Sequence, residues 1–502
     1  MKNLSLIPPV TLTTRLAIIV AVLFLATLAG LIAAIGEIVP VALFAGLIFG
    51  VVLLTQPNLL MWAAILGGLV LSGVVSLYLP GLAAVKWVVP MMGIALALIA
   101  ALRALSARTS LAAASDTNSS GVMKWLLAFF LVILISAVVN GSFSLNAIIS
   151  LKGYFQMLGI LLALAYFGFS PVQADRFVKA ILILGFVQLP FALHQFLFLV
   201  PERATAFAAS HLVVGVDVVV GTFLGSMQGG GASAVLAVFQ VTAISLLFAR
   251  WKRGLLKSRT TFISAFILLL PLTLNETKIT FLLLPFAFGL VFMDTLKKQP
   301  MKFIGGGLAI IAIVVGIFLG YTLLPKGQKH QSPSEYFEAA WVTNFGDAGY
   351  GSGELNRTTV LTHWVKSHYG DDFPYVFLGH GPGSVRSNAL GIPTALQLKY
   401  YGLGIDLTSI STMLWELGLI GTFTAIGLFW SAFKTAGKLL RLPGVPLERQ
   451  ALLTMAQVGI GMLGFSLLHN NYFIFEVGYQ TLLMLLIGYV VYWQKNQTLI
   501  GD

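Results

Sequence analysis

The sequence contains no cysteine, which excludes disulfide bonds and thiolate chemistry. Charged side chains are also scarce: Asp, Glu, Lys and Arg make up 10% of the 502 residues, whereas hydrophobic residues make up 58%. A typical soluble domain has about 25% charged residues. Together with a mean hydropathy of +0.92, this scarcity excludes a soluble globule and indicates a polytopic membrane protein.

The sequence also lacks the alternating segments of a membrane β-barrel. Its apolar runs contain Gly and Ala and approach the roughly 20 residues that a helix needs to cross a bilayer. We therefore predict an all-α polytopic membrane protein with about 14 transmembrane helices, in a range of about 12 to 14. The spans are expected near residues 15–35, 40–55, 59–78, 83–102, 123–140, 150–168, 176–199, 231–249, 260–274, 279–294, 303–323, 408–433, 450–468 and 474–493.

Lys and Arg gather at the ends of the expected spans, near residues 103–124, 250–259, 297–302 and 434–449. Short cytoplasmic loops retain such residues. Because an even number of spans separates each pair of groups, we expect all four groups and both termini in the cytoplasm. The net charge of +12 then reflects topology, and nucleic-acid binding is disfavoured because the cations lie in small groups at span ends.

The same parity places residues 324–406 outside as one large polar loop. The loop divides the chain into an N-terminal bundle, residues 1–323, and C-terminal helices, residues 407–502. Cations are disfavoured on the outer side, so those expected there need another explanation: Lys152, Arg203, Lys278, Arg357 and Arg386.

Three of these cations precede the large loop, and each has two interpretations. Lys278 either snorkels and pairs with Glu276 or holds an anionic headgroup at the membrane boundary. Lys152 is expected at a helix start, where snorkelling is the favoured interpretation. Arg203 pairs with Glu202 or with another carboxylate, or binds the substrate.

Arg357 follows a glycine-rich turn and comes before a predicted helix. An arginine can grip two phosphate oxygens at once, whereas lysine acts as a point charge. The alternative is a structural salt bridge to Glu354 or Asp371. Either interpretation fixes Arg357 at a defined position in the loop.

Residues 379–384 read Gly-His-Gly-Pro-Gly-Ser, and we call them the glycine turn. Its small side chains at Gly381, Gly383 and Ser384, with His380, would let backbone amides approach a phosphate or a sugar. The turn lacks the Gly-Lys-Ser ending of a nucleotide-binding loop, which excludes that function.

Two carboxylates follow the glycine turn. Asp406, just before the next span, is the candidate general base, and its structural alternative is the N-cap of a helix that starts at Leu407 or Thr408. Glu416 is about three turns into that helix and should face the interior with a partner. The histidines and carboxylates show no spacing that demands a metal, so we expect none, and no cofactor.

These features resemble the O-antigen ligase and O-antigen (Wzy-type) polymerase superfamily of bacterial inner-membrane proteins. The likeness covers mainly residues 270–430: Asn-Arg followed by Trp in the loop, then Leu-Gly-His-Gly-Pro-Gly-Ser, then Leu-Trp-Glu-Leu-Gly-Leu-Ile-Gly in the following span. The resemblance implies a GT-C-like helical bundle, in which two cations hold the diphosphate of a lipid-linked glycan. Lys278 and Arg357 stand at those positions here.

The family's ligases carry a His-Asn pair before the Glu-x-Gly helix, whereas this chain has Asp-Leu-Thr-Ser from Asp406. That departure favours a polymerase over a ligase. The resemblance implies metal-independent transfer of undecaprenyl-diphosphate-linked oligosaccharide repeats at the periplasmic face of the bacterial inner membrane. Chain-length and export proteins would be its partners. A flippase or transporter of lipid-linked glycan is the competing class, and a scaffold without an active site is a third.

Overall fold

The computed structural model describes residues 55–109, 120–142, 145–206, 215–228, 232–275, 277–323, 353–370, 373–387 and 393–500, and the single residues Ser334, Glu338, Trp341 and Gly346. These residues are largely helical, with no strand among them. The two spans expected before residue 55 lie outside this part of the chain. Residues 1–60 and 61–502 form separate compact units, and the arrangement below is that of the second.

The first half of the described chain contains α3 (Pro57–Leu66), η1 (Gly67–Leu71), α4 (Ser72–Tyr78), η2 (Pro80–Trp87), α5 (Val88–Thr109), α6 (Gly121–Val139), α7 (Leu145–Phe155), α8 (Leu158–Tyr166), α9 (Pro171–His194), η4 (Gln195–Leu199), α10 (Val200–Ala206) and η5 (Gly215–Val218). The second half contains α11 (Ser233–Lys252), α12 (Ser258–Leu274), α13 (Thr280–Lys298), α14 (Pro300–Leu323), α16 (Thr359–Ser367), α17 (Phe373–Leu378), α18 (Ala395–Lys399), α19 (Ser409–Leu439), α20 (Leu447–Ser466), α21 (Tyr472–Phe475), α22 (Val477–Lys495) and η6 (Gln497–Leu499).

By length and composition, six described segments can cross a membrane: Pro57–Tyr78, Val88–Leu105, Gly121–Val139, Pro171–Ala206, Ser233–Lys252 and Ser409–Leu439. The pair α7 and α8, bent by 51°, makes a seventh if it is one broken span. Each span expected from about residue 59 onward falls on one of the described helices or on a bent series of them. The protein is thus an all-helical membrane protein in its described part, and the total of about 14 stays a prediction.

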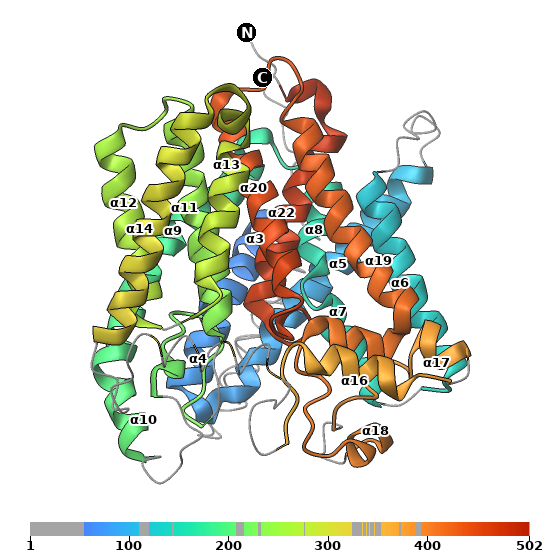
Figure 1. Ribbon diagram of the computed structural model, residues 1–502. Coiled ribbons are helices and arrows are strands. Elements are labelled where there is room, and N and C mark those ends of the chain that lie inside the picture. Colours follow the sequence, from blue (N-terminus) through green and yellow to red (C-terminus); the bar gives the residue numbers. More distant parts are fainter. Residues whose placement is uncertain are drawn as a thin grey trace, which may run out of the picture. The chain divides into compact units, whose positions relative to one another are not determined.

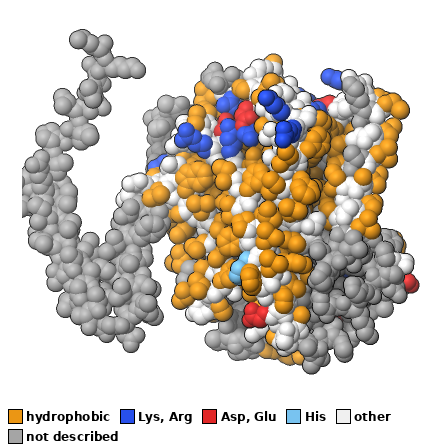
Figure 2. Space-filling model, turned by 90° about the vertical axis from the view of Figure 1, so that its left-hand side faces the viewer, with side chains coloured by type: hydrophobic (Ala, Val, Ile, Leu, Met, Phe, Trp, Pro, Cys, Tyr) orange, Lys and Arg blue, Asp and Glu red, His pale blue; other side chains and the backbone are white. Residues whose placement is uncertain are grey.

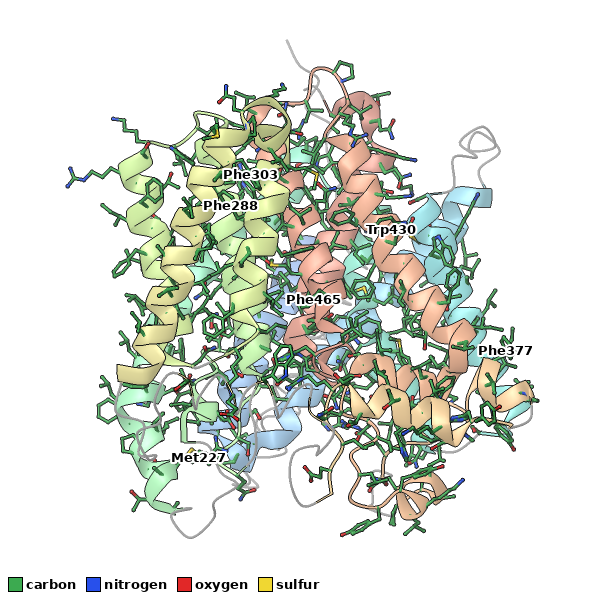
Figure 3. The ribbon with its side chains drawn as sticks, in the orientation of Figure 1. Met227, Phe288, Phe303, Phe377, Trp430 and Phe465 are labelled. Atoms are coloured by element: carbon green, nitrogen blue, oxygen red, sulfur yellow. The ribbon has the colours of Figure 1, made fainter. Side chains whose placement is uncertain are left out.

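The helices pack side by side, and the chain returns along the bundle several times (Figure 1). Contacts between neighbours are largely aromatic and aliphatic, as between Phe288 of α13 and Phe303 of α14, whose rings lie 5.4 Å apart (Figure 3). Buried side chains line α11, α20 and α22 most densely. These three helices form the centre against which the others pack.

Charge separates the two ends of the bundle. Arg250 of α11 and Lys179 of α9 both pair with Glu448 at the start of α20, and Arg449 approaches Asp175 within 3.7 Å. Figure 2 shows Lys and Arg gathered at this end on the face in view. We call it the cation-rich end, and the opposite end, where α16, α17 and α18 lie (Figure 1), the loop end. The separation fits the expected topology, while the cytoplasmic side itself stays a prediction.

Two local expectations are wrong. The N-cap of α19 is Thr408, whose hydroxyl accepts from the amide of Ser411, so Asp406 is not a cap. Lys152 lies in the last turn of α7 and not at a helix start. The span expected near 150–168 falls on two helices, α7 and α8, with a bend at residues 156 and 157, and its crossing as one broken span stays a prediction.

Candidate functional site

The connection between α20 and α22, residues 467–476, is the point where distant segments of the loop end meet. The Nε atom of Arg357 donates to the carbonyl of His469 at 2.6 Å. The amide of Ser409, at the start of α19, donates to the carbonyl of Asn470 at 2.8 Å, and Asn471 donates its side-chain amide to the carbonyl of Asp406. This connection therefore holds Arg357, which comes just before α16, close to Asp406 and Ser409 at the start of α19.

Asp406 and Arg386 form an ion pair beside this connection. The Nε atom of Arg386 lies 2.8 Å from Oδ2 of Asp406, and its guanidinium lies 3.2 Å from the ring centre of Phe475. The side chains of Asp406 and Arg386 remain 27% and 38% exposed. The pair combines a carboxylate that solvent can reach with a cation whose orientation is fixed by an aromatic ring.

Arg357 also acts electrostatically on His469. Burial of the imidazole and the positive charge of Arg357 hold the pKa of His469 well below its usual value of 6.5. The imidazole is therefore neutral at neutral pH. The hydrogen bond to the His469 carbonyl uses the Nε–H donor of the guanidinium.

Glu416 lies at the buried centre of the site, only 1% exposed. Its Oε2 atom accepts hydrogen bonds from Ser150 and Tyr154, each 2.9 Å long, and its carboxylate also accepts from the amide of Gly383. Arg386 acts on it electrostatically. Glu416 therefore lies in the interior with hydrogen-bond partners, as the sequence predicts.

The glycine turn is seated on a break in α19. Gly418 has φ 64° and ψ −162°, which interrupts the helix. The carbonyls of Trp415 and Glu416 are thereby released from the helical ladder, and they accept from the amides of His380 and Gly381 at 2.8 and 3.0 Å. The backbone amides of His380, Gly381 and Gly383 therefore make hydrogen bonds within the protein and do not face a ligand.

Side chains of the glycine turn point in two directions. His380 stacks on Tyr375, with ring centres 4.7 Å apart, and its Nε2 lies 3.1 Å from Nε2 of His368. The hydroxyl of Ser384 is buried and has no hydrogen-bond partner among the described residues. The turn is therefore part of an aromatic layer together with Trp415, and the unpaired hydroxyl is its one candidate for binding a ligand.

A second polar group on this connection combines the predicted Arg203 with Asp217 and Tyr472, which were not expected from the sequence. Arg203 of α10 is 1% exposed and is stabilised by the charge of Asp217, which also acts on Tyr472. Burial, Glu476 and Asp217 together hold the pKa of the Tyr472 hydroxyl above its usual value. Arg203 thus takes Asp217, and not the adjacent carboxylate, as its acidic neighbour.

Glu476 caps α22, only 1% exposed, and its carboxylate accepts from backbone amides at Tyr479, Gly478 and Leu224. The signal for Glu476 and Asp217 is present in the sequence, since each is an isolated acidic residue within an apolar run. Such isolated carboxylates require partners when they are buried.

The two remaining predicted cations are Lys278 and Lys152. Lys278 is exposed on the turn between α12 and α13, where the side-chain amide of Asn275 donates to the carbonyl of Ser233 at the start of α11. That turn is at the loop end, as α16 is (Figure 1). Lys152 lies with its Nζ 4.2 Å from the ring centre of Trp87.

Two predicted ion-pair partners, Glu276 for Lys278 and Asp371 for Arg357, lie outside the described residues. Among the residues that the structure describes, no group of three or more His, Asp or Glu side chains is arranged to hold a metal ion. No family model and no curated protein matches this chain. The site must therefore be interpreted from its own chemistry.

Proposed function

We propose that this protein is a membrane glycosyltransferase that polymerises undecaprenyl-diphosphate-linked oligosaccharide repeats, with O-antigen ligase activity as the alternative within the same reaction class. The observation that carries the proposal is the meeting of Arg357, Arg386 and Asp406 on residues 467–476. Cations for a diphosphate and a solvent-accessible carboxylate for a hydroxyl proton are the two requirements of this reaction.

In the proposed step, the oxygen of an acceptor hydroxyl forms a bond to the anomeric carbon of the donor sugar. The bond from that carbon to the diphosphate oxygen breaks, and undecaprenyl diphosphate leaves with the bonding electrons. The hydroxyl proton passes to the carboxylate of Asp406, which the Nε–H group of Arg386 orients. Arg357, together with Lys278 on the turn between α12 and α13, stabilises the charge that develops on the leaving group.

The other carboxylates suit this role less well. Glu416 is 1% exposed and accepts from Ser150 and Tyr154, and Glu476 is equally buried as the cap of α22. Both are positioning groups in the proposal. Arg203, which is also buried, interacts electrostatically with Asp217, whose charge also acts on Tyr472.

Undecaprenyl diphosphate itself provides a test that needs no knowledge of the sugar repeat. We expect the Arg357→Ala variant in lipid nanodiscs to bind it about 10- to 100-fold more weakly than the wild type, as loss of charge-assisted hydrogen bonds predicts. Lys366→Ala, which removes an exposed cation from α16, is the matched control and should bind normally. Equal affinity of the Arg357→Ala variant and the wild type would remove the proposed role.

Activity requires a second measurement. Purified protein supplied with a lipid-linked repeat unit should produce a ladder of glycans, and Arg357→Ala should abolish it. A polymerase elongates the lipid-linked material alone, whereas a ligase needs a separate lipid acceptor. Transport of intact donor across the membrane without any ladder would favour the flippase class instead.

A further inference from the structure

A hollow of about 290 Å³ lies at the cation-rich end, far along α19 from the site described above. It is bordered by α6, by the second half of α19 and by the chain around the end of α22. Its lining combines two lysines, two tryptophans, two hydroxyl residues and two glutamines: Lys434, Lys438, Trp125, Trp430, Ser431, Thr435, Gln494 and Gln497, with Gly121, Leu439 and Leu442. No acidic residue contributes to this lining.

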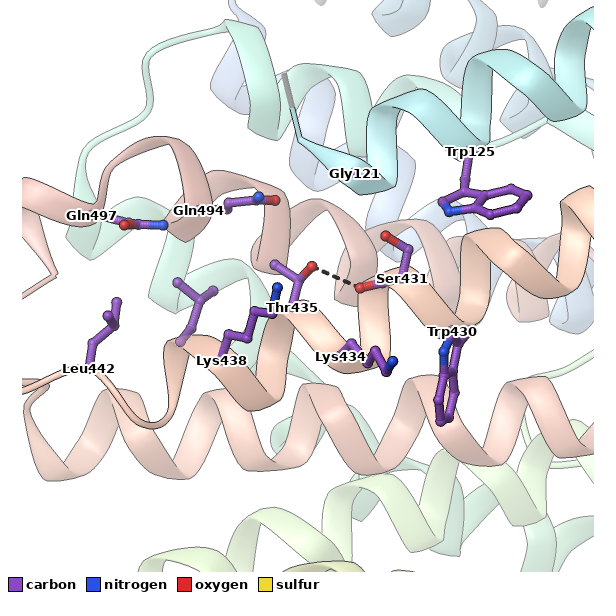
Figure 4. Close-up of a pocket in the computed structure, with 11 residues that line it drawn as sticks. Gly121, Trp125, Trp430, Ser431, Lys434, Thr435, Lys438, Leu442, Gln494 and Gln497 are labelled. Carbon is purple, nitrogen blue, oxygen red and sulfur yellow. Dashed lines mark hydrogen bonds between the residues drawn. The ribbon is translucent and has the colours of Figure 1, made fainter. Parts of the chain in front are cut away.

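The arrangement is ordered along the hollow. Trp125 and Trp430 lie at one end, Gln494 and Gln497 at the other, and the lysines lie between them (Figure 4). Lys434 and Lys438 share a face of α19, because residues four apart in a helix are neighbours. The hollow therefore presents two positive charges between an aromatic wall and a hydrogen-bonding wall.

Among the described residues, the two lysines have no acidic counterpart. Neither Lys434 nor Lys438 forms an ion pair with any carboxylate that the structure describes. At the same end, Lys179, Arg250 and Lys252 do pair with acidic side chains. An anionic ligand would supply the negative charge that the lining of the hollow lacks.

An apolar stripe on α19 leads directly to these lysines. Phe423, Ile426 and Trp430 are 64, 43 and 56% exposed, and their spacing of three and four residues continues to Lys434. Figure 3 shows Trp430 on the outside of α19. Exposed apolar side chains of this kind face lipid in a membrane protein, so acyl chains can lie along the stripe while a headgroup reaches the lysines.

The position of Trp125 is built into the packing. A side chain at Gly427 would place its Cβ 2.4 Å from Cε3 of Trp125, so the absence of a side chain there lets the indole lie against α19. The Trp125 ring also contacts Phe423 edge-on, with centres 5.6 Å apart. The aromatic wall of the hollow is therefore a fixed feature.

We propose that this hollow binds the phosphodiester headgroup of an anionic phospholipid from the leaflet at the cation-rich end. Basic recesses between helices suit such headgroups, and each lysine near the surface contributes about fivefold in affinity, which is about 1 kcal/mol. The volume of about 290 Å³ is enough for a headgroup and too small for a whole lipid. This site is independent of the proposed glycosyl transfer at the loop end.

Native mass spectrometry of the full chain with phosphatidylglycerol and with phosphatidylcholine tests the proposal. We expect the wild type to retain phosphatidylglycerol preferentially, and the Lys434→Gln, Lys438→Gln double variant to bind it at least about fivefold more weakly. The control double variant Lys257→Gln, Lys298→Gln removes the same charge at the same end outside the hollow and should bind normally. An equal loss in both variants would show general surface attraction and would overturn the proposal.

Two further measurements separate the source of the ligand and the contribution of shape. Glycerol 3-phosphate in large excess should not displace phosphatidylglycerol, because it lacks the chains that lie on the stripe; complete displacement would instead assign a site for soluble phosphate esters. Gly427→Leu, which pushes Trp125 out of place, should weaken phosphatidylglycerol binding at least threefold without changing the net charge. Unchanged binding in this variant would contradict the headgroup pocket.

Discussion

The Nε atom of Arg357 donates a hydrogen bond of 2.6 Å to the carbonyl oxygen of His469, although 112 positions separate the two residues. The bond ties the large polar loop to the connection between α20 and α22. Burial of the His469 imidazole lowers its pKa, and the positive charge of Arg357 lowers it further. The loop is therefore coupled electrostatically, as well as mechanically, to the C-terminal helices.

This coupling predicts a pH dependence of stability. The folded pKa of His469 is below its unfolded value of 6.5, so the native state resists protonation, and stability falls as pH drops below about 6.5. Arg357→Gln should weaken this dependence by raising the pKa of His469. His469→Gln should remove the part of the pH dependence that comes from the imidazole. Thermal unfolding of the three proteins between pH 5 and about pH 8 measures the effect. A wild type and His469→Gln variant with the same pH profile would contradict the assignment.

Asp406 should be needed for turnover more than for folding. Its ion pair with Arg386 is partly exposed, and such a pair contributes only about 0–1 kcal/mol to stability. Asp406→Asn should therefore lower the polymerisation rate by about 10²- to 10⁴-fold with a nearly unchanged melting temperature. The control is Glu354→Gln, another exposed carboxylate of the loop. Full activity of the Asp406→Asn variant would exclude it as the base.

Lys278 is predicted to act on the leaving group and not on the fold. It is exposed, so Lys278→Ala should change stability by less than about 0.5 kcal/mol. The glycan ladder should nevertheless weaken, and Lys278→Arg should restore part of it because the charge is kept. Lys399→Ala, on α18, is the matched loop control. If the Lys278→Ala variant gives the wild-type ladder, the diphosphate is held without this cation.

The break in α19 should be sensitive to a single methyl group. At Gly418, with φ 64°, an added Cβ would lie 2.4 Å from the carbonyl carbon of Phe377. Gly418→Ala should therefore destabilise the protein by more than about 2 kcal/mol and loosen the glycine turn. Gly289→Ala, in α13, meets open space and should be neutral or stabilising. Thermal unfolding in detergent compares the two, and equal melting temperatures would show that the break is not required.

Glu416 and Tyr154 should be energetically coupled. Tyr154→Phe removes a donor to the buried carboxylate and should cost about 1–3 kcal/mol. In a Glu416→Leu background the same change should cost much less, because the carboxylate is gone. Tyr401→Phe, at an 86% exposed position, is the control. Additive effects in this double-mutant cycle would mean that the hydrogen bond contributes nothing.

Local sequence properties determined the class of fold. Scarce charge and long apolar runs leave helices as the way to satisfy the backbone in lipid, and the described helices fall where hydropathy predicts them. The gathering of cations at one end is also local, because each group lies beside its own span. The polar loop is predicted as the candidate site for the same reason, because its content of charged residues departs from the surrounding composition.

Only the tertiary structure decided which of those polar residues meet. Glu416 finds Ser150 and Tyr154 more than 260 positions away, and Arg357 finds His469. No periodicity within one helix encodes such pairs, because they depend on which helices pack together and in which register. The glycine turn illustrates the limit: its residues suggest free amides, but a break at Gly418 in another segment supplies carbonyls that bind them. The sequence determines which chemical groups a residue carries, whereas the packing of the helices determines which other residues it contacts.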